Sequence, residues 1–285
     1  MTGRAVPEVV YRLEAPATGA WPGRHRSTSG DGGMEFRSHQ LLADAPDARR
    51  LDLLASLREP LGRWLVRRNS QRLAVPVVVL ADLSASMAWQ PPDGPPRMAV
   101  VADLVQALAG SAWKCGDSFG LLGAAQAPLP AFTLLPSRVR GLGQTLADRL
   151  RRHVPEGRSA QGLLQAAALL GRRRALVFLV SDFHWPAALL PAVLGRLAHH
   201  QLVPVVLRHP AEAQAGARQG LWPVQDAESG QRQLRWWRPA LRQRWQAAWD
   251  DDQAALAQSL ARHRCRPVWL AHGFDADALS RHFLA

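Results

Sequence analysis

The sequence has only two cysteines, Cys115 and Cys265, and they lie far apart in a chain of 285 residues. A disulfide framework needs several cysteines and a cysteine zinc site needs closely spaced pairs, so both are excluded. A low cysteine content is also typical of proteins in a reducing compartment. No apolar run reaches the roughly 18 residues of a membrane-spanning helix, and the first residues contain no apolar signal segment. We therefore expect a cytoplasmic protein with no membrane span.

Lysine is nearly absent as well, because Lys114 is the only lysine among 35 basic residues. The net charge of +12 raises nucleic acid as a partner. The arginines are spread along the chain, however, and no basic run coincides with a known nucleic-acid-binding motif. Arginine in place of lysine, beside abundant alanine, leucine, glycine and proline, is also typical of a GC-rich coding sequence. Nucleic-acid binding is therefore kept as a functional hypothesis, but it ranks below the two that are described next.

The middle of the chain alternates between short apolar runs and amphipathic segments. The runs predict buried strands at 75–81, 118–124, 175–180 and 202–207, and a short edge strand at 132–135. Helical spacing of apolar residues predicts helices at 98–113, 138–153, 159–170 and 186–200. Apolar strands separated by helices indicate an α/β fold with a doubly wound, mostly parallel sheet.

We expect two parts in the chain. Residues 1–71 are interpreted as an N-terminal extension packed on the core, with a short strand at 9–13 and a helix at 47–70. Residues 72–285 are expected to form one domain with a core that reaches about residue 208. Its C-terminal additions are a hairpin of strands 221–224 and 231–237, a helix at 239–263, a strand at 268–271 and a closing helix at 275–283.

The first buried strand is followed directly by Asp82, Ser84 and Ser86. In a doubly wound sheet the carboxyl ends of the strands form the ligand crevice, so these side chains are expected at its rim. One carboxylate with hydroxyls and water suits Mg²⁺, which binds oxygen ligands and keeps several waters; Mn²⁺ suits the same ligand types. The motif predicts a metal site, although a turn or helix cap is the ordinary role of such residues.

Two further residues are candidates for the same crevice. Asp182 follows the strand at 175–180, and it faces Asp82 if the two strands are neighbours. Ser159, in the loop that opens a helix, can add a hydroxyl. A carboxylate at a second strand end strengthens the prediction of a metal site in the crevice.

These motifs are similar to those of a known family. The pattern Asp-x-Ser-x-Ser after the first strand resembles the metal-ion-dependent adhesion site of von Willebrand factor type A domains. Most of the chain resembles the bacterial domain-of-unknown-function family 58, which is von Willebrand factor type A-like and is typically encoded beside MoxR-type AAA+ ATPases. The matching segments are 23–27 (GRHRS), 30–36 (GDGGMEF), 82–87 (DLSASM), 116–120 (GDSFG), 181–183 (SDF), 209–212 (HPAE) and 226–230 (DAESG).

The resemblance implies a von Willebrand factor A-like domain over 72–285 and a role for each candidate residue. Asp82, Ser84 and Ser86 hold the metal directly or through water, and Asp182 bonds a metal-bound water. Ser159 stands where the family usually has threonine. An acidic side chain of a partner completes the coordination. The implied function is a non-enzymatic protein-interaction module that acts with a MoxR-type AAA+ ATPase or with a client that this ATPase remodels.

The chain departs from the family in one segment and leaves one enzymatic alternative open. In residues 40–53 only Asp47, Arg49 and Asp52 match the usual pattern, so the role of that segment in relatives is not carried over. The alternative function is a hydrolase that uses metal-activated water in the same crevice. Such an enzyme needs a general base, and the sequence offers His184 or Glu156.

Overall fold

A computed structural model describes residues 7–14, 22–26, 35–70, 72–186, 188–213, 220–225 and 232–284. The glycine cluster at 30–33 and the turn expected at 226–230 lie outside these ranges. The chain divides into two compact units. The larger contains Met1–Arg12 with Pro76–Ala285, and the smaller is Leu13–Val75. Each unit is described by itself below.

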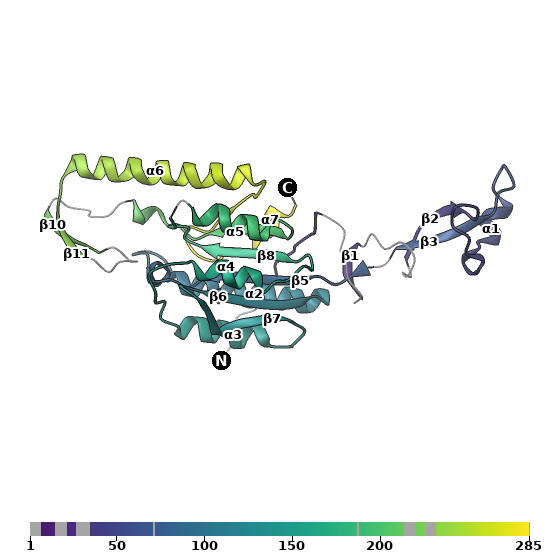
Figure 1. Ribbon diagram of the computed structural model, residues 1–285, viewed down its shortest axis with the longest axis horizontal. Helices are drawn as coiled ribbons and strands as arrows, with labels where there is room; N and C mark the ends of the chain where they lie inside the picture. Colours follow the sequence, from purple (N-terminus) through teal and green to yellow (C-terminus); the bar gives the residue numbers. More distant parts are fainter. Residues whose placement is uncertain are drawn as a thin grey trace. The chain divides into compact units, whose positions relative to one another are not determined.

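A six-stranded sheet forms the centre of the larger unit (Figure 1). Its order is β12-β9-β8-β5-β6-β7, and every neighbouring pair is parallel except β6 with β7. The predicted α/β fold with a mostly parallel sheet is therefore confirmed. The bounds of the strands are Pro76–Asp82 for β5, Ser118–Ala124 for β6, Pro128–Ser137 for β7, Leu176–Ser181 for β8, Gln201–Val206 for β9 and Val268–Trp269 for β12.

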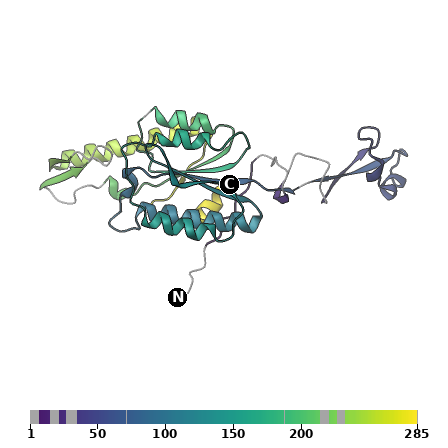
Figure 2. The ribbon, with the colours of Figure 1, turned by 60° about the horizontal axis from the view of Figure 1, so that its bottom comes forward.

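Helices cover both faces of this sheet, with α2 and α3 on one side and α4 and α5 on the other (Figures 1 and 2). Every residue of β5 is buried as a result, which explains why that strand is apolar throughout instead of alternating. The helices lie within or close to the predicted ranges: Arg97–Cys115 for α2, Leu142–Arg152 for α3, Gly162–Ala168 for α4 and Leu189–Leu197 for α5.

The C-terminal additions follow the prediction closely. Strands β10 (Gly220–Gln225) and β11 (Arg232–Trp237) form an antiparallel hairpin, and α6 (Pro239–Arg262) and α7 (Ala276–His282) come after it. The helical spacing of α6 predicts one apolar face, made of Leu241, Trp245, Trp249, Leu256 and Leu260. In the structure only Leu256 and Leu260 are buried, in the same core cluster as residues of α4 and α5. The first half of α6 is largely exposed.

The predicted strand at 9–13 is wrong. Val9 donates its backbone N–H to the Ser111 hydroxyl (2.9 Å), and the Tyr11 hydroxyl donates to Asp117 Oδ2 (2.6 Å). The segment is therefore held by the side chains of Ser111 in α2 and of Asp117, two residues after α2, and it forms no strand. Burial, and then the charge of Asp117, raise the pKa of Tyr11 well above its usual range.

The smaller unit corrects the predicted helix at 47–70. The segment contains two short helices, η1 (Ala48–Arg50) and α1 (Leu53–Leu57), and then strand β3 (Leu65–Ser70), which pairs with β2 (Glu35–Leu41). The chain turns at Gly62, whose positive φ of 64° breaks a helix. Strand β1 (Pro22–Arg26) pairs with β4 (Arg72–Leu73).

Two family-matching residues of this segment cap those short helices. Asp47 accepts from the backbone N–H of Arg49 (3.1 Å), and Asp52 accepts from that of Ala55 (3.1 Å). Hydrogen bonds from Arg67 and then His39 hold the pKa of the Asp52 carboxyl well below its usual range. In this chain the matching acidic residues therefore have structural roles.

Among the helices that the structure describes, none is both long enough and apolar enough to cross a membrane.

One buried histidine predicts a pH dependence of stability. The backbone N–H of Ala175, just before β8, donates to Nδ1 of His200 (3.2 Å). Burial, followed by the charges of His199 and Arg174, lowers the pKa of His200 to about 4. The unfolded chain then binds a proton that the native state rejects, so stability is lost as the pH falls from about 6.5 to about 4.

We expect His200→Asn, which keeps an acceptor for the N–H of Ala175, to remove about 2 kcal/mol of that loss. Urea unfolding of both proteins between pH 4 and pH 7 measures the difference. Equal pH dependence in the two proteins would show that the prediction is wrong.

Candidate functional site

The two candidate carboxylates lie at the same edge of the sheet. Asp82 is the last residue of β5, and Asp182 directly follows β8. These strands are parallel neighbours, with Ala81 opposite Val180. The structure therefore brings together the two strand ends that the crevice argument joined.

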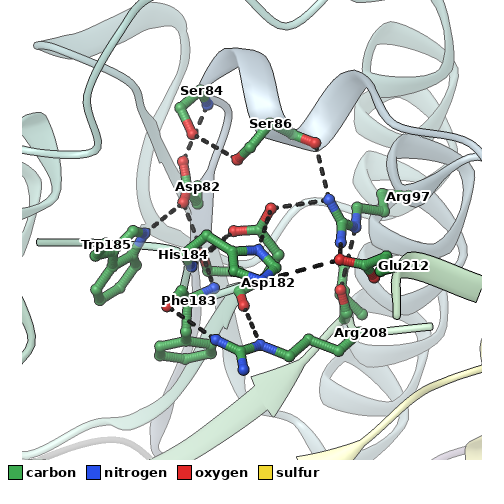
Figure 3. A network of polar contacts seen from close by, with 12 residues as sticks. Asp82, Ser84, Ser86, Arg97, Asp182, Phe183, His184, Trp185, Arg208 and Glu212 are labelled. Atoms are coloured by element: carbon green, nitrogen blue, oxygen red, sulfur yellow. Dashed lines mark hydrogen bonds and ion pairs between the residues drawn. The ribbon is translucent and has the colours of Figure 1, made fainter. Parts of the chain in front are cut away.

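Asp82 is completely buried and accepts hydrogen bonds from neutral donors (Figure 3). Its Oδ1 accepts from the backbone N–H of Ser84 (3.0 Å), and its Oδ2 accepts from the Ser181 hydroxyl (2.7 Å) and from Trp185 Nε1 (2.8 Å). Among the described residues, no cationic group forms an ion pair with it. Burial, and then the charge of Asp182, raise the pKa of Asp82.

The two serines of the motif lie on the turn beside Asp82. Ser84 caps the short helix η2 (Ala85–Ala88), which contains Ser86. Both serines are buried, and their hydroxyl oxygens are 3.4 Å apart. Two hydroxyls and one carboxylate from five consecutive residues are thus gathered at one point.

Ser159 is near this turn but is not joined to it by its own side chain. Its hydroxyl accepts from the backbone N–H of Gln161 (3.1 Å). The loop that contains it is attached through the backbone, because the N–H of Ala85 donates to the carbonyl of Gly157 (3.1 Å). In the contacts of the described residues, Ser159 makes none with Asp82, Ser84 or Ser86.

Asp182 is also completely buried, but unlike Asp82 it has cationic neighbours. Its Oδ2 lies 2.8 Å from Nη1 of Arg97 and 3.4 Å from Nδ1 of His184, and its Oδ1 accepts from the backbone N–H of His184 (3.2 Å). Burial raises the pKa of Asp182, but the hydrogen bond from His184 and the charge of Arg97 outweigh it. The net pKa is well below the usual range, so Asp182 is an anion.

Arg97 is a residue of the candidate site that sequence reasoning missed. Its side chain is 7 % exposed, and it donates to the carbonyls of Leu207 (Nε, 3.1 Å) and Ser86 (Nη1, 2.9 Å). It also forms ion pairs with Asp182 and, through Nη2, with Glu212 (2.6 Å) in η3 (Pro210–Glu212). One sequence signal exists: Arg97 is the first residue of α2, where the helix dipole disfavours a cation.

A second buried arginine holds the loop that follows β8. Arg208 Nε donates to the carbonyl of Asp182 (2.7 Å), and Nη2 donates to that of Phe183 (3.1 Å). Phe183 has a positive φ of 55°, a conformation that costs a non-glycine residue free energy unless its surroundings fix it. Arg208 also pairs with Asp252 of α6 (2.8 Å), so it ties this loop to that helix.

The two residues considered as a general base differ in their surroundings. His184 is partly exposed and lies between Asp182 and Glu212, with Nε2 3.9 Å from the carboxylate of Glu212. Glu156 is exposed and has no contact with Asp82 among those of the described residues. In the contacts of the described residues, neither side chain reaches Asp82, Ser84 or Ser86.

Comparison with known families identifies the chain. The family model described as "Protein of unknown function DUF58" matches residues 42–255. The chain belongs to the DUF58 family. The match spans part of the smaller unit, the whole central sheet except β12, and most of α6.

Solved structures and curated proteins add little to this identification. The DUF58 chain is 14 % identical to the conserved hypothetical protein BatB from Bacteroides thetaiotaomicron, with 74 % of this chain and 96 % of that chain covered and a TM-score of 0.46. It is 13 % identical to an aerotolerance-related membrane protein from Bacteroides fragilis. That match covers 74 % of this chain and 97 % of that chain, and its TM-score is 0.45. No curated protein matches the chain. These weak likenesses carry no functional argument.

The donor set of this DUF58 chain limits the kinds of metal that it can hold. Among the described residues, no group of three or more His, Cys, Asp or Glu side chains is placed to bind a metal ion. A metal at Asp82 would therefore depend on the hydroxyls of Ser84 and Ser86. Hydroxyl and carboxylate oxygens are ligands for hard cations and unsuitable for a thiolate or imidazole zinc site.

The contacts of Arg97 predict a large effect on stability. Replacing Arg97 with methionine leaves Asp182 and Glu212 without their shared cation, and we expect a loss of about 3–5 kcal/mol. Arg97→Lys keeps the charge but not the planar set of donors, so its loss should be smaller.

Urea unfolding at neutral pH measures both variants, with exposed Arg149→Met as the control that changes charge at the surface. A loss below about 1 kcal/mol for Arg97→Met, a value ordinary for a surface substitution, would contradict this account.

Proposed function

We propose that this DUF58 chain is a non-enzymatic, metal-dependent protein-interaction module with a von Willebrand factor A-like adhesion site. Asp82, Ser84 and Ser86 would hold Mg²⁺, with Mn²⁺ as the alternative. Asp182 would contribute through water, and Ser159 is the least supported member of the set. The observation that carries the proposal is the buried Asp82 carboxylate, which has two hydroxyls beside it and no cationic partner among the described residues.

The surroundings of Asp82 suit a divalent cation. A buried carboxylate with a raised pKa gains from a positive charge more than an exposed one does, because water no longer stabilises its anion. The neutral donors Ser181 and Trp185 occupy one carboxylate oxygen and fix its orientation. Ser84 and Ser86 supply hydroxyl oxygens on the same side, which fits the preference of Mg²⁺ for oxygen ligands.

Charge compensation nearby explains why such a site would bind an anion. Arg97 already neutralises Asp182, so Asp82 is the one uncompensated carboxylate among the residues proposed to hold the cation. A divalent ion bound there would keep positive charge and attract an acidic side chain of a partner. Arg97 and Arg208 would keep the loop after β8 in place while the partner binds.

The partner is proposed from the family resemblance. Because members of the family are typically encoded beside MoxR-type AAA+ ATPases, we propose that the partner is such an ATPase or its client protein. The hydrolase remains the alternative. His184, its best base, is held between Asp182 and Glu212 and makes no contact with Asp82, Ser84 or Ser86 among those of the described residues, which favours the interaction function.

Metal binding predicts a gain in stability that depends on Asp82. At a Mg²⁺ concentration about 100 times the dissociation constant, the gain is about 2.7 kcal/mol, and thermal unfolding with Mg²⁺ or with EDTA measures it. We expect no gain for Asp82→Asn or for the Ser84→Ala, Ser86→Ala pair. Exposed Asp251→Asn removes the same charge elsewhere and should keep the full gain. Equal gains in all variants would disprove the site.

Partner binding gives a separate prediction. We expect the purified MoxR-type ATPase of the same genome to bind the immobilised full chain in Mg²⁺, and to be released by EDTA. Asp82→Ala should abolish retention, whereas Asp251→Asn should not. If retention of the ATPase is unchanged by EDTA and by Asp82→Ala but falls as the salt concentration rises, the binding is nonspecific and electrostatic. Metal-dependent turnover of phosphoesters that requires His184 would support the hydrolase instead.

A further inference from the structure

The hairpin of β10 and β11 is a sheet of only two strands among the described residues. Figure 1 shows it beside the start of α6, apart from the six-stranded sheet of its unit. An isolated two-stranded hairpin is at best marginally stable in water, and it gains stability from a third strand or from a surface packed on it. The hairpin would therefore gain stability if a further strand or a partner's surface bound to it.

One face of this hairpin presents exposed apolar side chains. Leu221 of β10 lies opposite Trp236 of β11, and Leu234 is on the same face because it is two residues from Trp236. Leu221, Leu234 and Trp236 are 56 %, 68 % and 58 % exposed. Large apolar side chains grouped in this way mark an interaction site more often than scattered ones do.

The two outer edges of the hairpin differ in what they can pair with. Strand β10 contains Pro223, which has no N–H to donate, whereas β11 contains no proline. Among the described residues, β11 pairs only with β10, so its outer edge can accept a further strand. An added strand on β11 would lie beside Leu234 and Trp236.

The sequence of β11 and of the segment that follows it carries charge of one sign. Residues 231–249 contain five arginines and no acidic residue; the arginines are Arg232, Arg235, Arg238, Arg242 and Arg244. Two of these belong to β11, and the others lie at the start of α6 or just before it. Opposite charges on directly paired residues of neighbouring strands stabilise the pairing, so an added strand should be acidic.

We propose that β11 binds an extended segment of a protein partner, in which acidic and apolar residues alternate, as a third strand. Main-chain hydrogen bonds to the edge, apolar contact with Leu234 and Trp236, and attraction to the arginines act together in this mode. A nucleic acid offers no aliphatic surface for Leu221 and Leu234. A bilayer offers no strand to pair with the edge. This site is separate from Asp82 and requires no metal.

The test uses the full chain in EDTA, so the outcome does not depend on the proposed metal site. The probe is a fluorescein-labelled peptide of four glutamate-valine repeats, and anisotropy measures its binding. There are two control peptides. One has lysine in place of every glutamate, and the other keeps the glutamates but has alternate backbone nitrogens methylated. We expect binding of the first peptide only, because the lysine peptide is repelled and the methylated one cannot complete the hydrogen bonds.

Variants of the chain test whether the peptide binds at β11. We expect the Leu234→Ser, Trp236→Ser pair to weaken binding at least about tenfold, which corresponds to about 1.4 kcal/mol. The Arg238→Gln, Arg244→Gln pair lies outside the strands and should also weaken binding, with an unchanged circular dichroism spectrum. Arg149→Gln, an exposed arginine of α3, should have no effect.

Three outcomes would overturn the proposal. The first is peptide binding that is unchanged in both double variants. The second is equal binding of the methylated peptide, which would exclude strand addition. The third is binding to phosphatidylglycerol vesicles or to single-stranded oligo(dT) without binding to the glutamate peptide, which would assign the hairpin to a membrane or to nucleic acid.

Discussion

A completely buried carboxylate, that of Asp82, ends the central strand of the sheet without a cationic partner among the described residues. Burial of an anion is costly, and the protein offsets only part of that cost through neutral donors from Ser84, Ser181 and Trp185. The other features of the site follow from this constraint. They fix the direction of the carboxylate, bring two hydroxyls beside it, and keep a second carboxylate nearby in an already compensated state.

Two buried arginines with different contacts hold the loops of the site, and only Arg97 compensates the charge of Asp182. Arg97 neutralises Asp182 and Glu212 and also bonds the carbonyl of Ser86, so it links the turn after β5 to the loop after β8. Arg208 bonds the carbonyls of Asp182 and Phe183 and pairs with Asp252 of α6. These contacts join the turn after β5, the loop after β8 and α6 on the inner side of the site.

Sequence reasoning predicted the strands of the central sheet and the helices that cover it well, because buried parallel strands are apolar throughout. It placed Asp82 and Asp182 at one edge, since the ends of neighbouring parallel strands meet there. It missed Arg97, whose partner Asp182 is 85 residues away and whose residue type is common in this chain. The helix at 47–70 was wrong because leucines at helical spacing do not reveal that residues 65–70 pair with β2.

The most direct test of the central claim is the position of a bound metal. A crystal of the full chain grown with Mn²⁺ would give an anomalous difference peak wherever that ion binds. The account predicts one peak bounded by the side-chain oxygens of Asp82, Ser84 and Ser86. A peak elsewhere, or none at a saturating Mn²⁺ concentration, would contradict the claim that this buried carboxylate holds a cation.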